Sequence, residues 1–130
     1  MFGEGLAFER VCLEHTDCIK KKLGISGVLT EEKSWSSKGN PEKGTGGTQI
    51  DLLIVRRDQI INLCEMKYSN SEYRLTEKVD SDIRRRIYNF KEETGTKYTI
   101  HPILITPYGL VDNSYAQNIQ GVISMEDLYV

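Results

Sequence analysis

Apolar residues recur at helical spacing near the start of the chain. Over residues 5–23 they fall on one side of a helix: Phe8, Cys12, Ile19 and Leu23. Gly24 follows as a natural stop, and the three lysines at positions 20–22 suit the negative end of the helix dipole. We therefore expect a first helix over residues 5–23.

A second helical pattern covers residues 75–94. Its apolar positions form one stripe, which we expect to face the core: Val79, Ile83, Ile87 and Phe90. Gly95 then supplies a residue that readily ends a helix.

Strand patterns fill most of the remaining chain. Residues 49–56 and 60–68 are rich in Ile, Leu and Val, and a short polar turn at Arg57 and Asp58 joins them, so they predict an antiparallel hairpin. Weaker patterns predict further strands within residues 25–35, 98–106 and 118–123. Residues 36–47, rich in Gly, Ser, Asn and Pro, predict a mobile loop. Ser124 and Asp127 predict a capped final helical turn.

The resulting order is helix, three strands, helix, strand and a short final strand. A meander of three strands, followed by a helix and a returning strand, predicts an α/β fold with a central mixed β-sheet flanked by helices. A length of 130 residues suits a single domain spanning residues 1–130.

Composition restricts the possible functions. A net charge of −2 gives no general attraction to nucleic acid, so phosphate binding would need a local basic face or bound cations. The apolar runs are too short to span a bilayer, and no secretory leader is evident. Three cysteines without paired zinc spacing predict reduced thiols in a cytoplasmic protein without a membrane partner. Gly39 and Gly44 have the outer spacing of a P-loop, but no Lys-Ser/Thr follows Gly44, so we expect no nucleotide site.

Three ionisable residues interrupt the apolar hairpin: Asp51, Glu65 and Lys67. Strand alternation puts Glu65 and Lys67 on one face. A register centred on Asp58 would also put Asp51 opposite Glu65, with Cβ atoms roughly 5 Å apart. A slip by one residue would place the two carboxylates on opposite faces instead.

Paired carboxylates repel each other unless a proton or a cation lies between them, and their oxygens suit Mg²⁺ or Mn²⁺. Asp51 and Glu65 are therefore predicted metal ligands, with the Met66 carbonyl as a further one. Lys67 beside them would orient and polarise a water that attacks phosphorus. The simpler alternative is a structural ion-pair cluster without metal.

The arrangement resembles the PD-(D/E)XK, or restriction-endonuclease-like, superfamily, with Asp51 as the motif aspartate and residues 65–67 as its E-X-K. More narrowly, the chain is similar to the C-terminal nuclease-like domain of bacterial and archaeal AAA-type ATPases. The similar stretches cover nearly the whole chain: residues 5–15, 47–54, 61–68, 104–109 and 125–128. The resemblance implies a restriction-endonuclease-like core and a nuclease function. The chain departs from those proteins in carrying no P-loop and no ATPase, so the resemblance implies an excised domain.

The resemblance also implies that an additional acidic residue on the first helix corresponds to Glu9, with Glu4 and Glu14 as rivals and solvent exposure as the alternative. Gln49, two residues before Asp51, is a candidate to bond a phosphate or a metal-bound water. It is equally compatible with an edge-strand surface position.

Other polar residues have competing interpretations. His15 lies near the apolar face of the first helix, where it could touch the site, but we expect a packed or solvent-facing histidine. His101 begins a predicted strand and is expected to be structural. The basic residues of the second helix would contact DNA phosphates or form a solvated face: Lys78, Arg84, Arg85, Arg86 and Lys91. Tyr68 and Tyr73 would stack on bases or lie at the sheet margin.

The sequence thus predicts a Mg²⁺-dependent nuclease acting on nucleic acid, most simply DNA, alone or as a domain of an ATPase. The chief alternative is a nuclease-like module without catalysis that binds DNA or docks within such an ATPase. A third is an assembly domain without metal.

Overall fold

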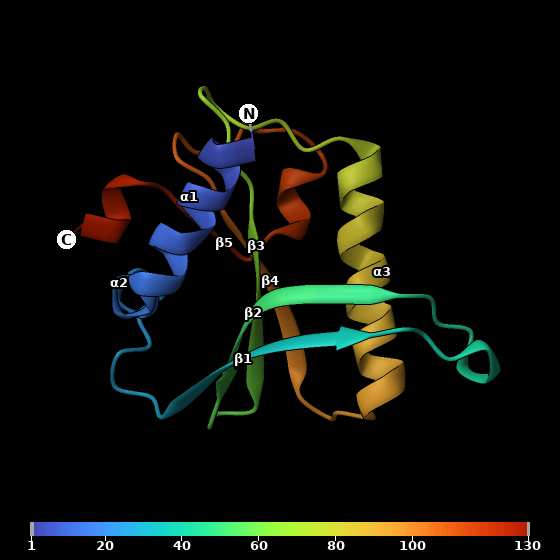
Figure 1. Ribbon diagram of the computed structural model, residues 1–130. Coiled ribbons are helices and arrows are strands. Elements are labelled where there is room, and N and C mark those ends of the chain that lie inside the picture. Colours follow the sequence, from blue (N-terminus) through green and yellow to red (C-terminus); the bar gives the residue numbers. More distant parts are fainter. Residues whose placement is uncertain (1, 130) are drawn as a thin grey trace.

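One five-stranded sheet separates two layers of helix in the computed structural model, which describes residues 2–129 (Figure 1). The strands follow one another across the sheet in chain order: β1 (Thr30–Ser37), β2 (Thr48–Arg56), β3 (Ile60–Met66), β4 (Thr99–Ile105) and β5 (Gly121–Ile123). The α-helices are α1 (Phe2–Glu14), α2 (Thr16–Lys22) and α3 (Glu77–Thr94). Three short 3-10 helices complete the structure: η1 (Pro41–Lys43), η2 (Ala116–Asn118) and η3 (Glu126–Tyr129).

The sheet is mixed. Strands β1, β2 and β3 form an antiparallel meander, whereas β3, β4 and β5 run parallel. Parallel neighbours need a crossover, and α3 supplies it between β3 and β4. The prediction of an α/β fold with a mixed sheet flanked by helices, in this order of elements, is confirmed.

Helix α3 matches the predicted pattern closely. The Thr76 side chain accepts a hydrogen bond from the Val79 N–H (3.3 Å), which caps the first turn. Gly95 ends the helix in the left-handed conformation (φ 65°). Ile83 and Phe90 are buried on the predicted stripe.

The predicted first helix is wrong in one respect, because it is two helices that separate at His15. Its backbone (φ −124°, ψ 36°) leaves the helical region, and its ring Nδ1 lies 2.7 Å from the Val11 carbonyl oxygen. That contact, and the stacking of the ring beside Tyr129 (5.4 Å between centroids), support the prediction of a structural histidine.

Several other boundaries differ from the prediction. Strand β1 continues through Ser37, so the predicted loop begins later, and a β-bridge between Asn40 and Thr45 closes the loop. Strand β5 starts only at Gly121, because the preceding residues form η2. None of the helices within residues 2–129 has the length and apolar character needed to cross a bilayer.

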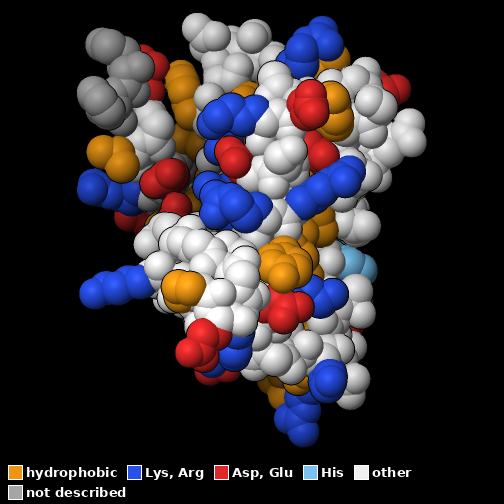
Figure 2. All heavy atoms as spheres, turned by 90° about the vertical axis from the view of Figure 1, so that its right-hand side faces the viewer, with side chains coloured by type: hydrophobic (Ala, Val, Ile, Leu, Met, Phe, Trp, Pro, Cys, Tyr) orange, Lys and Arg blue, Asp and Glu red, His pale blue; other side chains and the backbone are white. Residues whose placement is uncertain are grey.

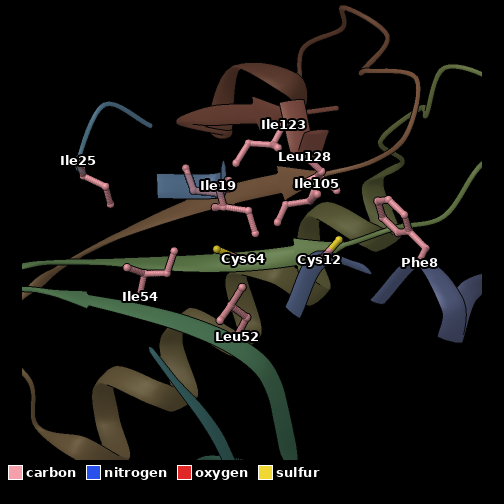
Figure 3. Packing of buried hydrophobic residues seen from close by; sticks show 11 residues of the cluster. Phe8, Cys12, Ile19, Ile25, Leu52, Ile54, Cys64, Ile105, Ile123 and Leu128 are labelled. Carbon is pink, nitrogen blue, oxygen red and sulfur yellow. The ribbon is translucent and has the colours of Figure 1, made fainter. Parts of the chain in front are cut away.

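The sheet is buried on both faces. On one side, α1 and α2 pack against Leu52, Ile54 and Cys64, and Figure 3 shows these residues around Cys12 and Ile19. On the other side, α3 covers a second cluster: Ile50, Leu53, Ile61, Leu63, Phe90 and Ile100. Two-sided burial explains why β2 and β3 have nearly continuous apolar sequences.

An irregularity in β2 bends the hairpin toward α3. Lys33 pairs with Leu53 and Trp35 pairs with Ile50, so Asp51 and Leu52 together stand opposite one residue of β1. This extra residue is a β-bulge, which interrupts alternation and increases local twist. As a result Ile50 packs on the α3 side, although Leu52 packs on the α1 side.

Candidate active site

The hairpin register fixes the relation between the two carboxylates. Val55 pairs with Ile61 and Leu52 pairs with Cys64, which confirms the register centred on the turn at Asp58. Continued one step beyond Leu52 and Cys64, the last pair of this ladder, the same register would set Asp51 opposite Glu65, but the pairing of the two strands ends before that position. The β2 bulge begins at this point, so Asp51 lies where the strands begin to diverge.

Glu65 is the buried member of the pair, with 9% of the residue exposed. It lies on the side of the sheet that faces α3, where Arg86 Nη1 donates to its Oε1 over 2.9 Å. Burial raises the pKa of the Glu65 carboxyl. The charges of Arg86 and Lys67 oppose that rise, and the charge of Asp51 adds to it. The structure therefore brings Asp51, Lys67 and Arg86 within electrostatic reach of Glu65.

Asp51 is exposed, unlike Glu65, and lies at the rim of the site. Gln49 Nε2 donates a hydrogen bond to Asp51 Oδ1 over 3.0 Å. The predicted proximity of Gln49 and Asp51 is thus found. The amide orients one carboxylate oxygen and leaves the other one open to solvent or a ligand.

Lys67 and Met66 stand at the end of β3. The Lys67 N–H donates to the Ile105 carbonyl (2.9 Å), which fixes its backbone beside β4. The Met66 side chain packs into the α1-side core, so only its main chain belongs to the site. The half-buried Lys67 follows directly, two residues after Glu65.

Glu9 occupies the opposite side of the sheet. It lies on α1 between Phe8, whose ring meets Tyr68 edge-on at 6.2 Å, and the buried Cys12. Burial, reinforced by the Glu9 charge, raises the pKa of the Cys12 thiol to about 12. In the part of the chain that the structure describes, no hydrogen bond or ion pair joins Glu9 to the carboxylate pair.

The α3 arginines have different surroundings: Arg84 and Arg85 are exposed, as expected of a solvated face, whereas Arg86 is not. Arg84 Nε lies 3.0 Å from Asp80 Oδ2, and Arg85 Nη1 donates to the Gly47 carbonyl (3.1 Å). Arg86 holds Glu65 and was not predicted as a site residue. Its position carried a signal, because residue 86 falls three after Ile83 and four before Phe90, on the apolar stripe, where a charge needs a partner.

Two further groups lie near this end of β3 and β4. Burial, followed by the charge of Glu65, raises the pKa of Tyr73, so this tyrosine borders the site. Thr106 continues β4 next to Lys67 in register and is fully buried. Its hydroxyl has no hydrogen-bond partner among the described residues. Alternation from Leu104, the neighbour of Glu65, directs the Thr106 side chain toward the α3 side.

The donor set suits a hard divalent cation. Two carboxylates near the end of the β2–β3 ladder, with main-chain oxygen beside them, could supply the partial protein coordination that Mg²⁺ usually has, with water and phosphate filling the other positions. Among residues 2–129, no three His, Cys, Asp or Glu side chains form a group able to hold a metal ion. A cation at Glu65 would share this carboxylate with Arg86.

Comparison with known proteins places the fold but not the chemistry. No protein-family model and no curated protein matches the chain. It is similar to the crystal structure of AF1548, a protein of unknown function, with 18% identity and a TM-score of 0.58. The similarity covers 91% of this chain and 64% of the other, so this chain spans less than two thirds of that protein. At this identity the likeness shows a shared fold alone.

Proposed function

We propose that this chain hydrolyses phosphodiester bonds of DNA with the help of Mg²⁺ or Mn²⁺. The observation that carries the proposal is the electrostatic proximity of Asp51 and Lys67 to Glu65, just past the last pair of the β2–β3 ladder. The resemblance of the sequence to PD-(D/E)XK nucleases supports the same assignment, as a free enzyme or as a nuclease domain of an AAA-type ATPase.

In this proposal Asp51 and Glu65 hold the cation, with the Met66 carbonyl available as a third ligand. The bound cation would act as a Lewis acid toward the scissile phosphate and make an attacking water more acidic. Lys67 orients that water and stabilises the negative charge that develops on the phosphate. Gln49 fixes the rotamer of Asp51 through their hydrogen bond. Glu9 would act only at longer range, through water.

Arg86 has a distinct task in the proposed site. A buried carboxylate without a partner tends to take up a proton and lose its affinity for metal. The guanidinium at 2.9 Å opposes the rise that burial causes in the pKa of Glu65, and it fixes the position of this carboxylate. Arg86 is thus a positioning residue for the metal ligand.

The test is DNA cleavage by the purified chain in Mg²⁺, Mn²⁺ or EDTA, on plasmid and linear DNA. We expect metal-dependent nicking that falls at least 100-fold in Asp51→Ala and in Lys67→Ala, since each change removes a group that acts on the transition state. Two variants at the far end of the hairpin and of β4, Asp58→Ala and Lys97→Ala, remove the same charges as controls. Metal-dependent cleavage that survives both site substitutions would refute the proposal.

A second candidate is a nuclease-like module that binds DNA, or docks within an ATPase, without cleaving. One observation favours it: Glu65 already has a cationic partner in Arg86, so its charge is compensated without metal. Calorimetry with Mn²⁺ separates the two. The second candidate predicts no heat of binding and no difference between the wild type and Asp51→Ala.

A further inference from the structure

The outward face of α3 carries exposed cations beside the candidate active site. Arg84 and Arg85 are both exposed, and with Tyr88, which is 50% exposed, they share one face at spacings of three and four residues. Lys38 and Lys43, on the loop between β1 and β2, are exposed as well. We call these five residues the basic face.

The loop and the helix belong to one surface. Arg85 donates to the Gly47 carbonyl, and Asn89 Nδ2 donates to Thr48 Oγ1 (2.7 Å). At Gly44, the position of a Cβ atom lies 3.9 Å from the Tyr88 hydroxyl. The loop therefore rests on α3, and Figure 1 shows it projecting on that side of the molecule.

The charges of the basic face are partly compensated, because α3 carries five acidic residues as well as five basic ones. Asp80 neutralises part of Arg84, yet the Arg84 side chain remains 67% exposed. The loop carries one exposed carboxylate, Glu42, and two further ones stand near the ends of α3, Glu77 and Glu92. Figure 2, a view from the side of α3, shows Lys and Arg side chains over this face with Asp and Glu side chains interspersed among them.

Hydrogen bonds of two consecutive arginines of α3 connect the basic face to the two carboxylates. Arg85 donates to the carbonyl of Gly47, the last loop residue before β2, which carries Asp51. The next residue, Arg86, donates to Glu65. The basic face thus begins at the rim where Asp51 is exposed. A DNA strand with one phosphodiester at Asp51 would place its neighbouring phosphates over α3.

We infer that the basic face binds the phosphate backbone of DNA and delivers it to Asp51 and Glu65. Arginine suits this task, because its planar guanidinium bonds phosphate oxygens in pairs. The overall charge of −2 then ceases to be an obstacle, since attraction is local. The inference rests on the proposed function for its direction, but binding on this face does not require cleavage.

The test measures binding of fluorescent duplex DNA by anisotropy in EDTA, where no metal-dependent cleavage occurs. The double variant Arg84→Ala/Arg85→Ala should weaken binding at least tenfold at low salt. The slope of log affinity against log salt should fall by about 2, since each lost phosphate contact releases about 0.9 of a counterion. Arg85→Ala alone, which leaves the Asp80 contact intact, should show about half of that change in slope.

Matched controls separate position from net charge. Lys21→Ala/Lys22→Ala removes the same charge from α2, on the other side of the sheet, and should change affinity less than threefold. Arg84→Lys/Arg85→Lys should retain most of the affinity, and thermal melting of each variant checks that it folds. Equal losses for the α3 and α2 pairs, or no DNA binding by the wild type, would overturn the inference.

Failure of the proposed function and failure of the inference about the basic face would give different experimental results. A wild type that binds DNA through Arg84 and Arg85 but never cleaves it would remove the proposed function and leave the basic face. Cleavage that depends on Asp51, with DNA affinity unchanged in Arg84→Ala/Arg85→Ala, would retain the proposed function and remove the inference about the basic face. Displacement of DNA by an equal charge concentration of poly-glutamate, or tenfold tighter binding of RNA, would assign the face to another class of partner and overturn the inference.

Discussion

Removing the Arg86 guanidinium is the sharpest perturbation of the site. Arg86→Met keeps an unbranched stem of similar length and deletes the cation that compensates Glu65. Breaking a fully buried ion pair by removing one partner costs about 3–5 kcal/mol. The side chains of Arg86 and Glu65 are 23% and 11% exposed. Because water screens part of the interaction, we expect a loss of about 2 kcal/mol of unfolding free energy at pH 7.5.

The loss should depend on pH in a defined direction. Burial already raises the pKa of Glu65, and Arg86 opposes that rise, so its removal raises the pKa further. A carboxyl whose folded pKa lies above its unfolded value, about 4.3, binds more protons when folded. Stability then falls as pH rises from the unfolded pKa through the folded one. The cost of Arg86→Met should therefore be large at pH 7.5 and small at pH 4.5.

Urea unfolding followed by circular dichroism measures both quantities, and thermal melting at pH 7.5 should show a drop of about 6–10 °C for a chain of this size. Arg84→Met is the matched control, because Arg84 is an exposed partner of Asp80 at i,i+4 spacing. It should cost about 0.5 kcal/mol, a value typical of such pairs. If Arg86→Met loses the same unfolding free energy at both pH values, the electrostatic role of Arg86 toward Glu65 is refuted. The loss would then come from side-chain packing alone.

Three other predictions concern Asp51, Phe90 and Thr76. Asp51→Asn should weaken Mn²⁺ binding at least tenfold by calorimetry, and Mn²⁺ should raise the melting temperature of the wild type but not of this variant. Phe90→Ala should cost about 3–5 kcal/mol in urea unfolding, because its buried ring packs edge-on against Trp35 at 5.2 Å. Thr76→Ala should cost about 1 kcal/mol through loss of the cap to the Val79 N–H, and Thr76→Ser should restore it.

The sequence correctly predicted those elements whose ends are determined by residues of the same segment, such as helix caps and tight turns. Helix α3 begins and ends where Thr76 and Gly95 indicate. The β2–β3 register follows from a tight turn at Asp58, which any neighbouring structure would leave unchanged. For that reason the pairing register on which the expected proximity of Asp51 and Glu65 depends could be anticipated before the fold was known.

Features that arise from contacts between distant segments were not predicted. The bulge at Asp51 accompanies the bending of the hairpin onto α3, where Trp35 meets Phe90. Arg86 acquires its role only when the crossover helix packs over Glu65, which no local pattern specifies. Periodicity alone likewise did not reveal the break at His15, because the apolar stripe continues across it.

The pairing of Arg86 with Glu65 has a consequence for how the site is assembled. All of its polar members, from Gln49 through Asp51, Glu65 and Lys67 to Arg86, lie within one continuous stretch, residues 49–86. A hairpin and the helix that follows it suffice to bring them together, and such short-range connections form quickly during folding. Substitutions in α1 or in the last turns of the chain should thus affect the site only indirectly, by changing the packing of the sheet that lies between them.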